Sequence, residues 1–231
     1  MEEATNLQPA EMPIEGMFSV SGSALEVEQW MLRGGGEPAV AFDLGGVLLE
    51  GGVLSLTGEA QAFTRLEEEF GIPFEAGLKI WRDLQDQSER GVMPASKVFQ
   101  ALSTAGTVPD PAGVEQALLD MVRPIPSAVS VLQDLHERGW RTALATNHLR
   151  TWVHEWQARF SWFECLDVIV VSAEIGERKP SPKFFARLEE RISATGSWFI
   201  DDRPENLEAA EKSGFRAVWV SGDGQWHVRA R

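Results

Sequence analysis

Four groups of polar residues follow short apolar runs, and their side chains together could carry out phosphoryl transfer. In chain order they are Asp43, Thr146-Asn147, Lys179 and Asp201-Asp202. They offer a carboxylate nucleophile, a small hydroxyl group, an ammonium group and an acidic pair. If the apolar runs are parallel strands of a doubly wound sheet, the loops that leave their carboxyl ends converge on one pocket. Residues that are distant in sequence would then share one site.

The acidic residues of this set are expected to bind a metal ion. The carboxylate of Asp43 can attack phosphorus and form an aspartyl-phosphate, but a carboxylate and a phosphate repel each other, so the attack needs a cation. Asp43, Asp201 and Asp202 offer hard oxygen ligands, which Mg²⁺ takes together with substrate oxygens and water. The sequence therefore predicts Mg²⁺ as the cofactor and Asp43 as the nucleophile.

The other polar groups are expected to bind the phosphate. Lys179 would hold phosphate charge as a point cation, and Thr146 and Asn147 would add polar contacts. The main-chain amides near Leu44 and Gly45 would form a backbone cradle, because glycine lets the chain come close to the phosphate. Each feature alone is typical of a turn or a helix cap, whereas four such groups at four strand ends are an improbable coincidence.

The apolar runs that must position these groups are short and bounded by turn residues. They are Ala39–Phe42, Arg141–Ala145, Val168–Val171, Trp198–Ile200 and Ala217–Val220. Continuous apolar runs of this length are typical of parallel strands that are buried on both faces. Helical patterns that end at or near glycines separate the later runs, over Ser127–Arg138, Ser181–Arg191 and Pro204–Lys212. The alternation predicts an α/β fold with a Rossmann-like, doubly wound parallel sheet.

Residues 57–123 interrupt this alternation, since they contain helical patterns and no convincing strand. The predicted helices begin at Thr57, Pro73, Pro94 and Asp110-Pro111. An N-cap residue followed by proline is a typical helix start. We therefore expect a small four-helix cap that is inserted into a core domain made of residues 38–56 and 124–231.

Two further segments flank the first strand. Val47–Leu56 is apolar on both sides of Glu50-Gly51-Gly52, which predicts a β-hairpin flap beside Asp43. Residues 1–37 mix acids, prolines and serines and end in three glycines, a pattern typical of a flexible linker. We expect a flexible N-terminal tail there, with a docking segment that contains a short helix over Ala24–Leu32 as the alternative.

The polar motifs resemble those of the haloacid dehalogenase-like hydrolase superfamily, in particular the subfamily with a helical cap inserted after the first motif. The matching stretches are residues 42–48, 145–147, 176–182 and 199–206. The resemblance covers about residues 38–222. Within the subfamily, the chain is similar to sugar-1-phosphate phosphatase-type members. It implies a hydrolase of phosphoric monoesters with the fold described above.

Carried over to this chain, the resemblance implies a role for each matching residue. Asp43 would be the nucleophile, and Thr146 and Lys179 would take part in catalysis by binding the phosphate. Asp43, Asp201, Asp202 and the carbonyl group of Gly45 would hold Mg²⁺. Asn206 would orient the lysine or the waters of the metal ion.

One position departs from the superfamily pattern. Phosphatases of this type usually have a second aspartate two positions after the nucleophile as general acid and base, but this chain has Gly45. General acid–base help accelerates a reaction by about 10²–10⁴-fold. An acidic leaving group needs less of this help, and Glu50 or a residue of the cap could replace the missing acid. Restoring it with Gly45→Asp is expected to raise turnover of alkyl phosphates more than that of aryl phosphates.

Three functions are open on this evidence. The leading prediction is a phosphatase for a small phosphorylated metabolite. Gly45 also suits a non-catalytic protein that binds phosphate or a partner, and it suits a haloacid dehalogenase, because a halide leaves without a proton. The acidic pair Asp201-Asp202 disfavours the dehalogenase, since it would repel a haloacid carboxylate and such enzymes need no metal.

Two aromatic side chains near these motifs have open roles. His148 directly follows the second motif and could face the pocket or cap a helix start. Trp81 of the predicted cap could stack on a sugar or pack in the core. Trp152, Trp156 and Trp162 follow helical spacing and are expected to fill a hydrophobic seam.

The composition limits the class of partner. The chain has 231 residues, of which 43% are apolar, enough for a folded core with an inserted domain. A net charge of −14 makes nucleic acid and anionic membrane surfaces poor partners. No apolar stretch reaches the ~18 residues of a membrane span, and no secretory signal is evident, so we expect a cytoplasmic protein. The pattern carries no information about substrate identity or oligomeric state.

Overall fold

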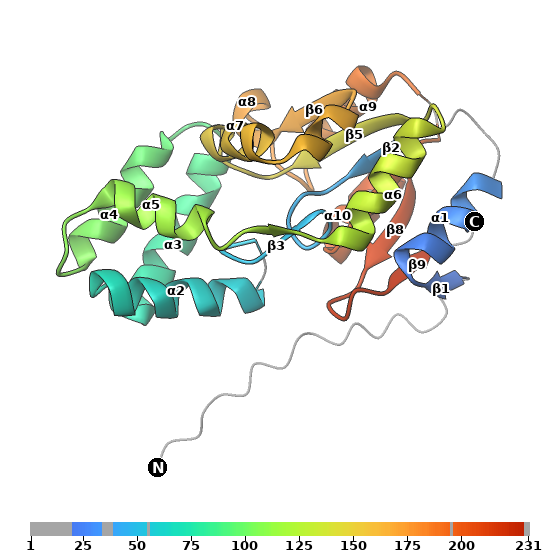
Figure 1. The fold of residues 1–231 in the computed structure, drawn as a ribbon. Helices are drawn as coiled ribbons and strands as arrows, with labels where there is room; N and C mark the ends of the chain where they lie inside the picture. Colours follow the sequence, from blue (N-terminus) through green and yellow to red (C-terminus); the bar gives the residue numbers. More distant parts are fainter. Residues whose placement is uncertain (1–19, 34–38, 55, 195, 229–231) are drawn as a thin grey trace, which may run out of the picture.

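The computed structural model describes residues 20–33, 39–54, 56–194 and 196–228 (Figure 1). Their main sheet has seven strands in the order β1-β9-β8-β7-β2-β5-β6. The strands β8, β7, β2, β5 and β6 run parallel to one another. Their bounds are Ala39–Phe42 (β2), Arg141–Thr146 (β5), Val168–Val171 (β6), Trp198–Asp201 (β7) and Arg216–Val220 (β8). The predicted doubly wound α/β fold is confirmed.

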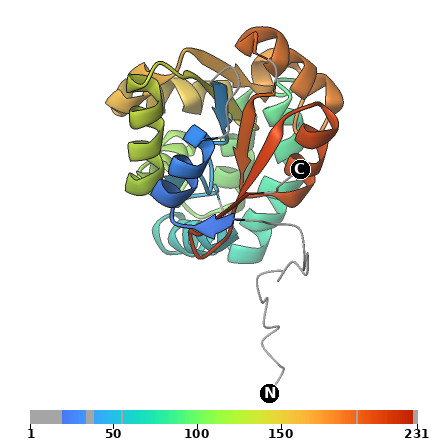
Figure 2. The same ribbon diagram turned by 90° about the vertical axis from the view of Figure 1, so that its right-hand side faces the viewer.

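Helices cover both faces of this sheet (Figure 2). In β2, Val40 and Phe42 belong to one hydrophobic cluster, while Ala39 and Ala41 belong to the other, because successive residues of a strand point to opposite faces. The first cluster contains residues of α1 (Ala24–Arg33), α6 (Pro126–Glu137) and α7 (Arg150–Arg159), and the second contains residues of α9 (Pro182–Ile192) and α10 (Pro204–Lys212). The short helices η1 (Ser161–Cys165) and α8 (Ser172–Ile175) flank β6.

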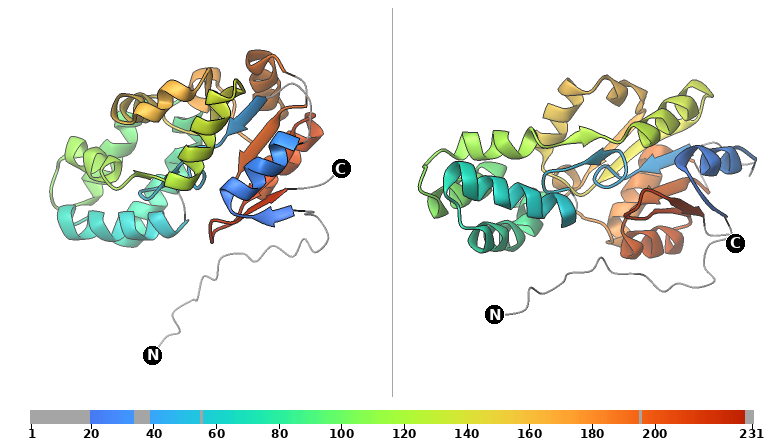
Figure 3. Two further views of the ribbon diagram at one scale, coloured as in Figure 1. Left: turned by 45° about the vertical axis from the view of Figure 1, so that its right-hand side comes forward. Right: turned by 60° about the horizontal axis from the view of Figure 1, so that its bottom comes forward.

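A separate helical lobe stands beside the sheet and is distinct from it in both views of Figure 3. It consists of α2 (Leu56–Phe70), α3 (Phe74–Glu89), α4 (Ala95–Ala105) and α5 (Pro111–Leu119). The lobe is inserted between the short strands β3 (Leu49–Glu50) and β4 (Arg123–Pro124), which pair antiparallel with each other. The chain therefore enters and leaves the lobe through one two-stranded ribbon.

This ribbon corrects the predicted hairpin. Gly51 and Gly52 do turn the chain, with φ angles of 85° and 56°, but the turn leads into α2 and not back onto the strand. Leu49 pairs with Pro124 and Glu50 with Arg123. A local hairpin within Val47–Leu56 is wrong, because the partner strand comes from the far end of the inserted lobe.

The prediction of a flexible tail is wrong for residues 20–33. Strand β1 (Val20–Gly22) pairs antiparallel with β9 (Trp226–Val228) and extends the sheet. Helix α1 buries Val27 and Met31 and packs against α6, because its apolar residues recur at helical spacing. Residues 1–19 and 34–38, which include the three-glycine stretch, lie outside the described residues. No helix in the described part of the chain combines the length and the apolar character that a membrane span needs.

Candidate active site

The predicted nucleophile lies at the carboxyl end of the sheet beside a buried lysine. Asp43 directly follows β2, and its main-chain amide donates to the carbonyl of Ile200 in the neighbouring strand β7 at 2.8 Å. The Nζ atom of Lys179 lies 2.8 Å from Oδ1 of Asp43 and 2.6 Å from Oδ2 of Asp201. β2 lies between β5 and β7, where the strand order reverses, the place at which doubly wound sheets bind their ligands. One ammonium group therefore bridges two carboxylates that the adjacent strands bring together.

The charges of this cluster depend on one another. Burial raises the pKa of Asp43 to about 6, although the positive charge of Lys179 and a hydrogen bond from the Leu44 main chain oppose the rise. Burial lowers the pKa of Lys179, but the attraction of Asp201 and Asp43 outweighs it and the net shift is upward. Lys179 therefore stays positively charged, and Asp43 is mostly ionised at neutral pH.

The three carboxylates that are predicted to bind the metal ion also come together. Carboxylate oxygens of Asp43, Asp201 and Asp202 all lie within 4.8 Å of one another. Oδ1 of Asp202 is buried and has no hydrogen-bond partner in the described structure. Burial, followed by repulsion from Asp43 and Asp201, raises the pKa of Asp202 to about 7. A divalent cation would offset this repulsion and would give Oδ1 of Asp202 a partner. The three carboxylates therefore fit Mg²⁺, which prefers oxygen ligands.

A glycine allows the loop after Asp43 to approach the acidic pair. Gly46 has a φ angle of +74°, and a Cβ atom at this position would lie 2.5 Å from Oδ2 of Asp202. Both the left-handed backbone and the contact exclude a side chain there. Gly46 therefore allows the loop after Asp43 to lie close to the side chain of Asp202.

Asn206 binds the carboxylate of Asp201 and influences Lys179 through that carboxylate. The side-chain amide of Asn206 donates to both carboxylate oxygens of Asp201, at 3.0 and 3.1 Å. The main-chain amide of Arg203 donates to Oδ1 of the same carboxylate at 2.8 Å. Asp201 is thus held in one orientation, and this orientation places its Oδ2 against Lys179.

The second motif splits into two positions. Thr146 ends β5 and lines the same cleft as Asp43. The side chain of Asn147 accepts a hydrogen bond from the Lys179 main-chain amide at 2.8 Å and donates to the Lys179 carbonyl at 2.9 Å. Asn147 thereby ties the loop that carries Lys179 to the end of β5.

The place of the missing acid is filled by another segment. Gly45 lines the cleft, but a Cβ atom there would lie only 2.9 Å from the carbonyl oxygen of Leu54 and 3.2 Å from its Cβ atom. Leu44 is buried, and its carbonyl accepts hydrogen bonds from the amides of Leu48 and Leu49. Glu50, the proposed substitute in the flap, is exposed and does not line the cleft.

The inserted lobe supplies cleft residues that were not predicted as site residues. Trp81, Gln85 and Glu89 of α3 line the same cleft. Glu89 contacts the guanidinium of Arg178 at 2.6 Å and accepts a hydrogen bond from Gln85 at 2.7 Å. Their spacing in the sequence could have indicated this, because Gln85 and Glu89 follow Trp81 at intervals of four residues and therefore share its helix face.

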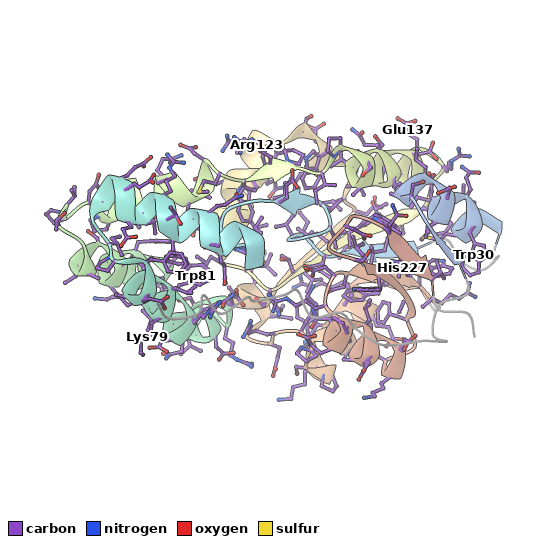
Figure 4. The ribbon with its side chains drawn as sticks, turned by 90° about the horizontal axis from the view of Figure 1, so that it is seen from below. Trp30, Lys79, Trp81, Arg123, Glu137 and His227 are labelled. Carbon is purple, nitrogen blue, oxygen red and sulfur yellow. The ribbon has the colours of Figure 1, made fainter. Side chains whose placement is uncertain are left out.

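Trp81 packs between the lobe and the core and does not offer a free ring. It is 2% exposed and stacks on Trp152 of α7 with a centroid separation of 6.1 Å. Figure 4 shows Trp81 within the lobe, whereas Lys79 of the same helix points outward. The core-packing interpretation of Trp81 is correct, and the sandwich of Trp81 and Trp152 joins the lobe to the core.

Comparison with known proteins gives the family. A model of haloacid dehalogenase-like hydrolases matches residues 38–214. A curated phosphatase of Mycobacterium tuberculosis is 26% identical over 202 residues, which cover 81% of this chain and 88% of that protein.

Solved structures share the fold at lower identity. A haloacid dehalogenase family enzyme of Bacteroides thetaiotaomicron has a TM-score of 0.66 at 17% identity, covering 80% of this chain and 94% of that one. An aspartate-to-alanine variant of that enzyme was solved with magnesium and inorganic phosphate. An L-2-haloacid dehalogenase of Xanthobacter autotrophicus has a TM-score of 0.58 at 23% identity, covering 81% and 80% of the two chains. Since the family model spans most of the chain and includes all four motifs, this protein belongs to the haloacid dehalogenase-like hydrolases.

Proposed function

We propose that this protein is a Mg²⁺-dependent phosphatase that hydrolyses a small phosphorylated metabolite through an aspartyl-phosphate on Asp43. The observation that carries the proposal is the cluster of one buried lysine and three acidic residues. Lys179 contacts Asp43 at 2.8 Å, and Asp43, Asp201 and Asp202 offer oxygens within 4.8 Å of one another. The Mycobacterium relative named a phosphatase and the Bacteroides enzyme with bound magnesium and phosphate support the same chemistry.

In the first step, an Oδ atom of Asp43 attacks phosphorus while the bond between phosphorus and the leaving oxygen breaks. The leaving oxygen keeps the electron pair and takes a proton from water. Lys179 and the hydroxyl of Thr146 hold the phosphoryl oxygens, whose charge would otherwise repel the carboxylate. Bound Mg²⁺ would be held by Asp43, Asp201, Asp202 and the Gly45 carbonyl, and it would supply further positive charge.

In the second step, water attacks the phosphorus of the aspartyl-phosphate. The bond between phosphorus and Asp43 breaks, the carboxylate is regenerated, and the proton of the water goes to solvent or phosphate. Gly45 offers no group for either proton transfer, so substrates with acidic leaving groups should react fastest.

Contacts support a role for Asn147 and a role for the inserted lobe. Both ends of the Asn147 amide bind the main chain of Lys179, so we assign Asn147 to positioning the lysine loop, with any phosphate contact secondary. Helices α2 to α5 act as the cap, since α3 closes one side of the cleft.

The alternatives make different demands on the acidic cluster. A haloacid dehalogenase would bring a substrate carboxylate beside Asp201 and Asp202, whose charges repel it. A non-catalytic phosphate-binding protein would keep Lys179 and Thr146 but would have no use for an ionised carboxylate at Asp43, which would repel the phosphate.

The test is turnover of p-nitrophenyl phosphate with and without Mg²⁺. Its aryl leaving group needs little protonation, so Gly45 is no obstacle. We expect turnover that EDTA abolishes, and a loss of at least about 10³-fold in Asp43→Asn, because a nucleophile is removed. Full activity in Asp43→Asn would end the assignment of the nucleophile, and halide release from a haloacid in EDTA would favour the dehalogenase.

A further inference from the structure

His148 carries a hydrogen-bond donor toward the cleft that no other described residue uses. The side chain is 5% exposed and lines the cleft beside Thr146 and Asn147. Its Nδ1 atom accepts a hydrogen bond from the main-chain amide of Leu149 at 2.9 Å. An accepting Nδ1 carries no proton, so the proton of the neutral ring must be on Nε2. The local backbone therefore fixes the tautomer.

The surroundings keep this ring neutral and immobile. Burial lowers the pKa of His148 to about 3. The ring stacks on Trp152 with a centroid separation of 5.3 Å and meets Trp156 edge-on at 4.7 Å. The main-chain amide of His148 is itself held by the hydroxyl of Ser172 at 3.0 Å. His148 is thus a rigid donor at physiological pH and cannot act as a proton shuttle.

The position of the ring separates it from the phosphate subsite. Trp152, on which His148 stacks, packs in turn on Trp81 of α3 and Phe99 of α4. His148 therefore lies on the cap side of Thr146, where the part of a substrate beyond its phosphate must be placed. Trp152 and Trp156 contact the ring of His148 and the Leu149 amide occupies its Nδ1 atom, so Nε2 is the ring nitrogen left to meet a ligand.

We propose that the Nε2–H group of His148 donates a hydrogen bond to a hydroxyl oxygen in the leaving group, and thereby selects hydroxylated phosphate esters. This deepens the proposed function and rests on it for the identity of the leaving group. A hydroxyl oxygen can accept this bond without placing a further charge beside the buried, neutral ring. An ammonium or purely apolar leaving group would leave the buried donor without a partner, which is unfavourable.

The first test measures the ring directly and needs no activity. ¹⁵N NMR of the whole protein should show His148 with a protonated Nε2 and an unprotonated Nδ1. The ring should not titrate between pH 5 and 8, the range in which an ordinary histidine does. A ring that titrates in this range, or that carries its proton on Nδ1, overturns the proposal.

The second test compares glycerol 1-phosphate with propyl phosphate, which have the same three-carbon leaving chain but differ in its hydroxyl groups. The ratio of their kcat/KM values should favour glycerol 1-phosphate, and His148→Phe should reduce this ratio by about 2- to 10-fold, as expected for one hydrogen bond. The change should lie mainly in KM, because the contact is present in the bound substrate as well as in the transition state.

Matched variants separate recognition from folding. His148→Gln offers an amide donor and should recover part of the ratio, while His154→Phe changes an exposed histidine of the following helix α7 and should leave the ratio as in the wild type. An unchanged ratio in His148→Phe overturns the proposal. If no phosphate ester is hydrolysed, the proposed function fails, and the inference is then decided on Asp43→Asn protein by NMR. Glycerol 1-phosphate, and not propyl phosphate, should shift the Hε2 resonance of His148, and no shift overturns the inference.

Discussion

The carbonyl oxygen of Leu54 lies 2.9 Å from the position that a Cβ atom would take at Gly45. Real Cβ atoms essentially never approach a backbone oxygen so closely. Packing therefore requires a glycine at position 45, apart from any role that an acid could have there. The segment between β3 and α2 occupies the space into which a general acid at position 45 would project.

This contact reverses the expectation that Gly45→Asp raises turnover of alkyl phosphates. We expect Gly45→Asp and Gly45→Ala both to lower the free energy of unfolding, by roughly 1–3 kcal/mol as for other overpacked sites, and neither to increase kcat on alkyl phosphates. Urea denaturation and steady-state kinetics check this. Gly222→Ala is the matched control, since nothing lies within 4 Å of the Cβ position there. Faster turnover in a stable Gly45→Asp protein would contradict the account.

The strands and the polar groups at their ends could be predicted because both are local in sequence. The run Ala39–Phe42 is buried on both faces and is followed by Asp43, so the pattern alone predicts the strand and points to the candidate nucleophile. The pairing of Leu49 with Pro124 and the contact of Leu54 with Gly45 depend on how a whole inserted lobe folds. The cleft residue Glu89 depends on how that lobe docks. No local pattern encodes such contacts, which is why the predicted hairpin was wrong and the packing of Leu54 against Gly45 was not foreseen.

Lys179 is expected to be important for stability as well as for turnover. Its ammonium group contacts Asp43 and Asp201 with almost no exposure to solvent. Lys179→Met leaves two buried carboxylates without their cation, and breaking a buried ion pair costs about 3–5 kcal/mol. Urea denaturation at pH 7 measures this loss. Lys79→Met removes an exposed ion pair with Asp83 and should cost at most about 1 kcal/mol. Equal effects of the two substitutions would show that the buried cluster adds no stability.

Metal binding should be measurable without turnover. We expect Mg²⁺ to bind the folded cluster and not the unfolded chain, so it should raise the free energy of unfolding by about 2.7 kcal/mol at a concentration 100 times its Kd. Asp202→Asn should weaken the effect strongly, because Oδ1 of Asp202 is the buried oxygen without a partner. Asp223→Asn, in the exposed turn before β9, serves as the control. A thermal shift with Mg²⁺ that is the same in wild type and Asp202→Asn would exclude Asp202 as a ligand.

Arg178 is expected to hold the cap against the core. Its guanidinium contacts Asp86 at 2.7 Å and Glu89 at 2.6 Å, both on α3, and it is adjacent in sequence to Lys179. Arg178→Ala leaves Glu89 buried and unpaired, so the cap should open more often and the protein should become more sensitive to limited proteolysis, with a higher KM. Arg187→Ala breaks an exposed pair with Glu190 and should change neither quantity. Unaltered proteolysis of Arg178→Ala would mean that other contacts keep the cap closed.

The docking of the N-terminal helix should depend on pH through Glu28. This residue of α1 is 1% exposed. Burial, followed by its contact with Asp134 of α6, raises the pKa of Glu28 from 4.5 to about 7, although Arg138 opposes the rise. The same contact, together with Arg138, lowers the pKa of Asp134. One carboxyl proton is therefore held between the two helices at mildly acidic pH.

The sign of the effect follows from proton binding. Between pH 4.5 and about 7 the folded state holds a proton on Glu28 that the unfolded state has lost, so this contribution to stability decreases as the pH rises through that window. Below the window both states are protonated and the stabilisation is complete, and above it the stabilisation is lost. Glu28→Gln keeps a neutral hydrogen-bonding group and should remove this part of the pH dependence. Urea midpoints at pH 5, 6, 7 and 8 for wild type and variant measure the difference, which also cancels the contributions of Asp43 and Asp202. Glu137→Gln, at an exposed position of α6, should keep the wild-type slope. If Glu28→Gln keeps it too, the shared proton does not stabilise the docked helix.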